Sequence, residues 1–287
     1  MLSFSALLLA LALVAVVESF VSLRTPFARS SLSKGLSMAV ELSELAETEI
    51  NPRKLEGGLS LQLDDGTRKS HSMAENSAFV TGFFKGLSNK KTFAELTKSL
   101  YFVYETMETA LESSDEARVI ALDFPNLRRT KALENDMEYF FGANWKNTIT
   151  PSAATKEYCD HILKTGRETP FLLVAHQYTR YLGDLFGGQM MGGMASRSLG
   201  LESEQGIAFY KFESIPNTRA FINEWYTTLN ALDFTEAQRQ EIVDEANVVF
   251  RLNIGIFSEL EGNGASTAFR LIMGAIKDKI NSLFEKK

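Results

Sequence analysis

Cysteine and histidine are scarce in this 287-residue chain, which contains one cysteine, Cys159, and three histidines, His71, His161 and His176. A single cysteine excludes a disulfide framework and indicates a reducing compartment. No histidine has a carboxylate three residues before it, so the sequence lacks the Glu-x-x-His pairs of di-iron carboxylate bundles. No two histidines lie three to five residues apart, so the sequence gives no sign of a zinc cage either.

Long apolar runs, basic stripes, strand-like alternation and internal repeats are also missing. The apolar run at residues 6–17 is too short to cross a bilayer, so we expect no membrane span in the mature chain. The formal net charge is −6, and without a basic stripe we expect no nucleic-acid partner. From Leu59 onward, apolar residues recur at spacings of three and four, as in Phe93, Leu96 and Leu100. The sequence therefore predicts an all-α protein.

The expected helices share this spacing and cover most of a single domain at residues 59–287. They lie at residues 59–87, 91–113, 131–141, 152–165, 170–199, 218–232, 235–262 and 265–284. Residues 39–58 are polar and contain Pro52 and a glycine pair, so we expect a loosely ordered N-terminal segment there.

The first 38 residues have the composition of targeting segments. The apolar run and the residues that follow it predict a signal peptide at residues 1–19. Residues 20–38 contain basic and serine residues but no acid, which is typical of a transit peptide. A signal peptide joined to a transit peptide at Phe20 resembles the bipartite presequences of algae with secondary plastids, and this implies the plastid stroma. An ordinary secreted protein with a disordered linker is the alternative.

Five glycines, at positions 183, 187, 188, 192 and 193, interrupt the apolar helix pattern that begins at residue 172. Each glycine inside a helix costs roughly 1 kcal/mol relative to alanine, so their number requires a reason. Gly183 and Gly187 share one helix face, and Asp184 and Gly188 share the adjoining face. A face without side chains can receive a flat ligand or a neighbouring helix, and the residues alone leave both possibilities open.

His71 and Glu75 lie one helical turn apart, so the carboxylate can accept the second N–H of the imidazole. This pattern suits a histidine that binds a metal, and a haem needs only one axial histidine. The neighbouring residues of His71 are polar, however, and a histidine in such surroundings is by default simply exposed.

Several segments in the same order resemble haem oxygenases of the cyanobacterial and plastid type. HQYTRYLGDLFGGQ (residues 176–189) is similar to the distal helix of this family, and GTRKSHSMAEN (residues 66–76) to its proximal helix. SLYFVYETMETAL, NLRRTKALENDMEYFFGANW and DEANVVFRLNIGIFSELEG also follow the family. The resemblance covers most of residues 59–262. It implies a single-domain multi-helix bundle with haem between a proximal helix and a distal helix kinked at its glycines.

The resemblance implies a site for haem, as both substrate and cofactor. His71 would bind the iron and Glu75 would hydrogen-bond its imidazole, while Gly183 and Gly187 would contact the haem through their backbone. The distal network would be anchored by Asp184, together with Tyr104, Arg180 and Asn253. Further residues near the haem would be Gly188, Phe250 and Phe257. Ordinary core packing explains the two phenylalanines equally well.

Three positions depart from the family pattern. Phe186 replaces a small serine, and Gly192 and Gly193 replace a lysine pair on the outer side of the helix. In AFINEWYTTLNALDF, Ile222 and Tyr226 stand where the family supplies a lysine and an arginine to the haem propionates. The remaining candidates for the propionates are Arg68, Lys69 and Tyr178.

The implied activity is the oxidative opening of haem to biliverdin, with release of carbon monoxide and ferrous iron. It would use O2 and electrons from reduced ferredoxin, and a downstream bilin reductase would be a further partner. Basic residues that could receive the acidic ferredoxin are Lys85, Lys90, Lys91, Arg128, Arg129 and Lys131, although a solvated face explains each of them about as well. Two alternatives stay open: a haem carrier or sensor that has lost efficient turnover, and a helical interaction protein with the same fold.

Overall fold

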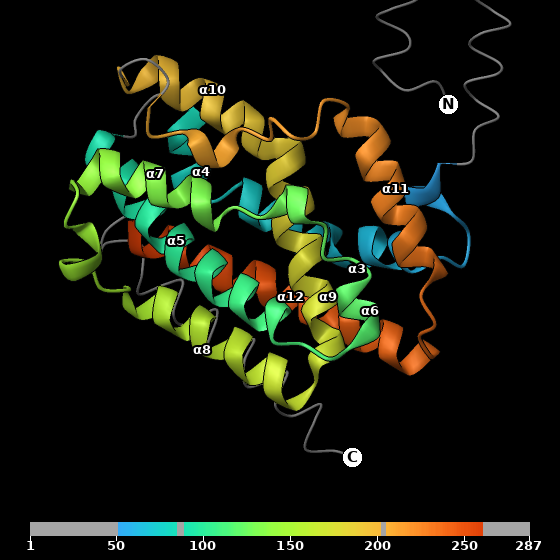
Figure 1. Cartoon of the computed structure of the whole chain (residues 1–287). Helices are drawn as coiled ribbons and strands as arrows, with labels where there is room; N and C mark the ends of the chain where they lie inside the picture. Colours follow the sequence, from blue (N-terminus) through green and yellow to red (C-terminus); the bar gives the residue numbers. More distant parts are fainter. Residues whose placement is uncertain (1–50, 85–88, 202–204, 261–287) are drawn as a thin grey trace, which may run out of the picture. The chain divides into compact units, whose positions relative to one another are not determined.

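The computed structural model describes residues 51–84, 89–201 and 205–260, and all its elements belong to one compact unit that begins at Pro52 (Figure 1). Within these ranges every regular element is a helix, which confirms the predicted fold class. None of the helices in these ranges is long and apolar enough to cross a membrane. The predicted targeting segments at residues 1–38 and the predicted helix at residues 265–284 lie outside the described residues.

The helix expected at residues 59–87 divides into α3 (Leu59–Glu75) and α4 (Ala78–Phe84). Asn76 ends α3, and its side-chain amide donates back to the Ser72 carbonyl at 2.8 Å. The Ser77 hydroxyl then accepts the Val80 N–H at 3.3 Å and so caps α4. Two adjacent polar residues thus stop one helix and start the next, which apolar spacing alone did not predict.

α12 (Glu236–Leu260) is the helix around which the others pack. It packs most extensively against α3, and it also contacts α4, α5, α8 and α9. Gly66 allows the close approach of α3, because a Cβ there would lie 2.4 Å from a Val243 methyl group on α12. Figure 1 shows α12 and α5 at the centre of the helices that surround them.

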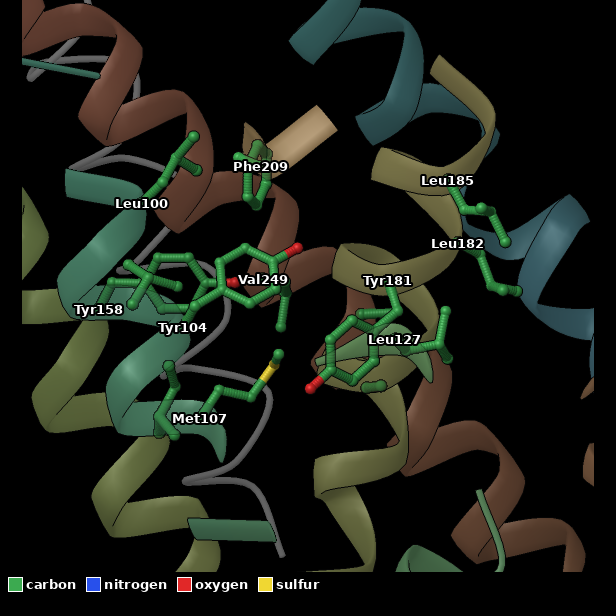
Figure 2. Packing of buried hydrophobic residues seen from close by; sticks show 14 of the residues in the cluster. Leu100, Tyr104, Met107, Leu127, Tyr158, Tyr181, Leu182, Leu185, Phe209 and Val249 are labelled. Carbon is green, nitrogen blue, oxygen red and sulfur yellow. The ribbon is translucent and has the colours of Figure 1, made fainter. Parts of the chain in front are cut away.

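α5 (Lys90–Glu112) carries the largest aromatic part of the core and packs against α7 (Thr130–Phe141) and α8 (Ala153–Glu168). Asn89 caps α5, as its side chain accepts the Thr92 N–H at 2.9 Å. Tyr104 of α5 is fully buried, and its ring meets that of Phe209 at 5.2 Å (Figure 2). The predicted apolar stripe of α5 is therefore the side that faces the core.

The helix predicted at residues 170–199 is continuous but not uniformly α-helical. It begins with η4 (Pro170–Leu172) and α9 (Leu173–Gln177) and ends with α10 (Gln189–Ser198). Between them lie two π-helical segments, η5 (Tyr178–Leu182) and η6 (Asp184–Gly188). π-helical turns are rare and are frequent at functional sites. The other elements are η1 (Pro52–Lys54), α6 (Ala117–Ile120), η2 (Pro125–Leu127), η3 (Trp145–Asn147), η8 (Ala208–Tyr210) and α11 (Thr218–Ala231).

Candidate functional site

His71 lies on the exposed side of α3, where 55% of its side chain is accessible to solvent. Its Nδ1 is 3.3 Å from Oε2 of Glu75, whose side chain is also exposed. A carboxylate in this position accepts the Nδ1 proton and fixes the tautomer of the ring, which leaves the lone pair on Nε2. The two residues predicted as iron ligand and partner are thus brought together, in a geometry suited to binding a metal through Nε2.

α12 brings the His71 region close to the predicted distal residues. The Phe250 ring on α12 meets the His71 ring edge-on, with centroids 5.6 Å apart. One turn later, Asn253 Oδ1 accepts a hydrogen bond of 2.9 Å from Arg180 Nη1 on η5. Phe257 is buried and stacks on Phe79 of α4 at 5.3 Å. Phe250 therefore contacts the imidazole, whereas Phe257 contributes to the packing between α12 and α4.

The four predicted distal residues form one hydrogen-bonded network. Arg180 Nη2 donates to Asp184 Oδ2 at 3.1 Å, and the Tyr104 hydroxyl donates to the same oxygen. The Arg180 guanidinium also lies 5.3 Å from the centre of the Tyr104 ring. Tyr104 and Arg180 are buried, while 17% of the Asp184 side chain is exposed. Asp184 and Asn253 are the partly exposed members of the network, and Asp184 is the acidic one.

Burial raises the pKa of Asp184 above its usual value, and the Arg180 guanidinium and the Tyr104 hydroxyl oppose this by stabilising the carboxylate. Burial also raises the pKa of Tyr104, which keeps its hydroxyl protonated as a donor. Because both hydrogen bonds end on Oδ2, Oδ1 is the oxygen of Asp184 that can hold a water molecule or a proton. Such a carboxyl group can pass a proton at its exposed edge.

Gly183 and Gly187 are exposed, and a Cβ on either would meet nothing within 4 Å beyond its own helix turn. Within the described residues, no neighbouring helix fills this face, so the backbone next to Asp184 is open to a flat ligand. Phe186 lies between the two glycines and is itself 63% exposed, which is unusual for a large apolar side chain.

Gly188 and Gly192 face the interior instead. A Cβ on Gly188 would lie 3.2 Å from the Tyr210 ring, and a Cβ on Gly192 only 2.6 Å from Tyr210 Cβ. Gly188 therefore packs against Tyr210, and its predicted haem contact stays a prediction. The prediction that Gly192 lies on the outer side of the helix is wrong, since the residue is buried. The cause is the pair of π-helical segments, which rotate the following residues relative to a regular α-helix.

Of the side chains predicted to meet the propionates, Tyr178 has a cationic neighbour, Arg53, that the sequence did not reveal. Arg53 Nε donates to Asp64 Oδ1 at 3.1 Å, and Lys54 also pairs with Asp64. Arg53 and Asp64 act on the pKa values of both Tyr178 and Tyr226, which burial raises. We call this group of five residues, Arg53, Lys54, Asp64, Tyr178 and Tyr226, the basic corner.

The basic corner lies beside the exposed glycines and His71. Tyr178 is hydrogen-bonded to Thr67, and Thr67 lies one turn before His71 on α3. Tyr178 also lies five residues, or one π-helical turn, before Gly183. Arg68 and Lys69 are exposed, and Arg68 pairs with Asp65 at 2.5 Å. Arg53 lies in η1, before the first long helix, so helical spacing in the sequence does not relate it to Tyr178.

A second histidine group joins residues that are far apart in the sequence. His161 of α8 and His176 of α9 each place Nε2 within hydrogen-bond distance of Glu245 Oε1 on α12, at 2.6 and 2.9 Å. Residue spacing does not reveal this group, because the three residues lie on different helices. His176, within the distal-helix motif, and Glu245 are both buried.

Comparison with known proteins identifies relatives over most of the described region. The family model "Heme oxygenase" matches residues 57–259. A "Heme oxygenase" of Guillardia theta is 40% identical over 230 residues, which is 79% of this chain and 97% of that protein. "Heme oxygenase 1" of Synechocystis is 42% identical over 206 residues, 71% of this chain and 85% of that protein. The crystal structure of the Synechocystis heme oxygenase-1 in complex with heme has a TM-score of 0.69 and 40% identity, covering 76% of this chain and 99% of that one.

Proposed function

Since the chain belongs to the haem oxygenase family, we propose that it opens haem oxidatively to biliverdin, with release of carbon monoxide and ferrous iron. We further propose that O2 is the oxidant and reduced ferredoxin the electron donor. The observation that carries the proposal is the placement of an exposed His71–Glu75 pair close to an open glycine backbone and the Asp184 network.

Haem fits the residues that are present. An axial ligand needs an accessible imidazole nitrogen, which His71 Nε2 provides. A flat macrocycle needs a surface without side chains, which Gly183 and Gly187 provide. Bound haem supplies the iron that activates O2 and the ring that is oxidised. The protein residues then have three tasks: to bind the iron, to orient the ring and to deliver protons.

We assign the iron ligand to His71 and its orientation to Glu75. A hydrogen bond from Nδ1–H to a carboxylate holds the ring plane and makes Nε2 a stronger donor. The edge-on contact with Phe250 restricts the same ring from its other side. Gly183 and Gly187 allow the distal backbone to approach the ligand, because any larger residue would place a Cβ in the open space.

Asp184 is the proton-delivering group in this proposal. Its Oδ2 is held by Arg180 and Tyr104, so the free edge of the carboxyl group has a fixed direction. Burial raises its pKa, so a proton resides on it at a higher pH than on an exposed aspartate. The open glycine backbone places no second acid beside it, and delivery therefore depends on Asp184 and on water at Oδ1.

The basic corner is proposed to bind the haem propionates. Ile222, where the family supplies a cation, is buried and cannot contribute. Arg53 and Lys54 together carry two positive charges against the single charge of Asp64, and 39% and 49% of their side chains are exposed. The excess positive charge attracts a further carboxylate, such as a haem propionate, to the basic corner. The Tyr178 hydroxyl is a further hydrogen-bond donor there.

One experiment separates this function from the alternatives. Hemin is added to the protein, and the Soret band is followed before and after addition of ferredoxin, its reductase and NADPH. We expect a shifted Soret band that decays into the absorption of biliverdin. A haem spectrum that stays unchanged after the reductants are added would indicate a haem carrier or sensor. A Soret band that does not shift with the protein would show that haem is not bound, and would favour a helical interaction protein.

Replacing the proton-delivering group tests the distal assignment. We expect Asp184→Ala to bind hemin with the parent affinity but to form biliverdin roughly 100-fold more slowly, which is the lower end of the effect of a positioned acid. Asp160→Ala is the matched control, because Asp160 is an exposed aspartate on α8 that pairs only with Lys156 among the described residues. Parent-like biliverdin formation by Asp184→Ala would contradict the assignment.

The basic corner is tested with hemin and with its dimethyl ester, which lacks the propionate charges. We expect Arg53→Gln to weaken hemin binding by about tenfold, the value of one partly exposed charge-assisted hydrogen bond. The same variant should bind the ester as the parent does. Lys164→Gln is the control with the same change of charge, because Lys164 is exposed on α8 and pairs with Glu168, and it should leave hemin binding unchanged. An equal loss for both ligands would show that Arg53 supports the fold and not the propionates.

The ferredoxin surface is proposed at the exposed start of α5. Lys90 and Lys91 are exposed there, and so is Lys131 at the start of α7. Arg129 is buried and bonds the Lys211 carbonyl at 2.7 Å, and Arg128 pairs with Asp123, so these two arginines are structural and not candidates. Lys85 lies outside the described residues.

We also propose a plastid location, supported by the acid-free serine-rich segment at residues 20–38 and by relatives in algae such as Guillardia theta. A fusion of residues 1–38 to a fluorescent protein, expressed in an alga with secondary plastids, tests it. Fluorescence outside the plastid would contradict the proposal. A downstream bilin reductase remains a proposed partner on chemical grounds, because biliverdin is the substrate of that class.

A further inference from the structure

We propose that His161, His176 and Glu245 form a second, separate binding site, for one divalent transition-metal ion of the Zn²⁺ class. One ligand atom from each residue lies within 4.8 Å of the other two. Two imidazole nitrogens and one carboxylate oxygen are the donor set of three-ligand zinc sites and of non-haem iron sites. The site does not involve His71 and does not depend on the proposed reaction.

The charge at Glu245 favours a cation. The side chain is 9% exposed, and its ion-pair partners among the described residues are His161 and His176. An imidazole compensates the charge of a carboxylate only in its protonated form, and an uncompensated charge is costly in a buried position. A divalent ion bound by the same three atoms would supply that charge.

Metal binding requires one histidine to move, because the ligand nitrogens of the two histidines are separated by up to 4.8 Å and must approach to roughly 3.3 Å. Ligands about 2.0–2.2 Å from a tetrahedral zinc ion lie roughly 3.3 Å from one another. The present separations from Glu245 Oε1 are 2.6 Å for His161 and 2.9 Å for His176, so each must widen by less than about 1 Å. His161 can move, because it is on the outer helix α8 and 28% of its side chain is exposed. The same exposure lets water occupy the fourth position.

One feature limits the expected affinity. Metal-bound histidines ordinarily donate their other ring N–H to a second group, and the loss of that partner costs about 10–100-fold in affinity. His176 is fully buried, and its Nδ1 has no hydrogen-bond partner within the part of the chain that the structure describes. We therefore expect binding weaker by that factor than in a fully supported site.

The test is an optical titration of the full chain with Co²⁺, followed by displacement with Zn²⁺. We expect one Co²⁺ per chain, visible d–d bands of a four-coordinate ion, and loss of these bands when Zn²⁺ is added. His161→Gln should weaken binding at least tenfold, because it removes one of three ligands. Cys159→Ser and His71→Gln are the matched controls and should bind as the parent does, since they remove the only thiol and the exposed histidine.

Three outcomes would overturn the site. They are the absence of saturable Co²⁺ binding, equal affinity in His161→Gln and the parent, and loss of binding in His71→Gln, which would move the ion to the α3 surface. Circular dichroism shows whether His161→Gln is folded, and His161→Ala repeats the test if it is not. The Soret shift with hemin is a separate measurement, so failure of the metal site and failure of the haem function are distinguishable.

Discussion

Two histidine–carboxylate groups of this protein occupy opposite environments. His71 and Glu75 lie on the exposed side of a single helix, whereas His161, His176 and Glu245 join three helices at their contact. An exposed imidazole exchanges water for a ligand at a small cost in free energy. Removing that imidazole leaves no buried charge without a partner. A buried carboxylate must keep its partners, because removing them leaves an uncompensated charge. The first group is therefore suited to exchanging a ligand at the surface, and the second joins three helices whether or not the proposed ion is bound.

His71→Ala should give the largest effect on function and almost none on stability. Without an axial nitrogen we expect biliverdin formation to fall to background, while the free energy of unfolding changes by less than about 0.5 kcal/mol, as for other surface substitutions. Added imidazole should restore part of the haem spectrum and turnover. An unchanged haem spectrum would move the iron ligand to His161 or His176 and would remove the distinction between the two groups.

Glu245→Ala should give the reverse result. Breaking a buried pair costs about 3–5 kcal/mol, so we expect the urea midpoint to fall accordingly. The variant, at a urea concentration where it is still folded, should keep the parent's haem spectrum. A loss of stability below about 1 kcal/mol would show that the buried group contributes nothing special to the fold.

Lowering the pH should reduce the contribution of Glu245 to the stability of the parent protein. Burial by itself would raise the pKa of Glu245, but the hydrogen bonds and charge interactions with His161 and His176 outweigh burial and lower this pKa to about 2, compared with an ordinary value of 4.5. Because the folded pKa is depressed, its contribution is fully present above pH 4.5 and is lost as pH falls towards 2. The difference corresponds to about 3 kcal/mol. Denaturant unfolding at a series of acidic pH values should show a steeper loss for the parent than for Glu245→Gln, and equal slopes would contradict the assignment.

Glu75→Gln should give the smallest effect. The exposed carboxylate orients the imidazole but does not bind the iron, and its loss should weaken hemin binding by about tenfold. Stability should stay as in the parent, in contrast to Glu245→Gln. Hemin titration with a parallel urea denaturation measures both. A Glu75→Gln variant that unfolds more easily would show that the exposed pair also supports α3.

The all-α fold and the bounds of most long helices followed from apolar spacing, because core-facing positions on α5 and α12 repeat at the helical period. The sequence did not reveal the rotation within residues 170–199. A π-helical turn takes up roughly one residue more than an α turn, which changes the direction of later side chains by about 100°. Two such turns rotate Gly192 from the predicted outer side to the interior, where it meets Tyr210.

The site was predictable where its residues lie one turn apart. His71 with Glu75 and Arg180 with Asp184 are such pairs, and both meet in the structure as expected. Arg53 was not found, because its position beside Tyr226 depends on how the chain returns to α11. The group of His161, His176 and Glu245 was not found either, because residue spacing identifies partners on one helix and these residues lie on three helices.

During synthesis, α3 leaves the ribosome long before the helix against which it packs most extensively. It has 17 residues, a length at which an isolated helix is only marginally stable in water. Its main partner, α12, is the last helix of the described chain, and Gly66 is shaped to receive Val243 from it. His71 is therefore among the first described residues to be made and among the last to take its place, so haem can meet a complete site only after α12 has been made.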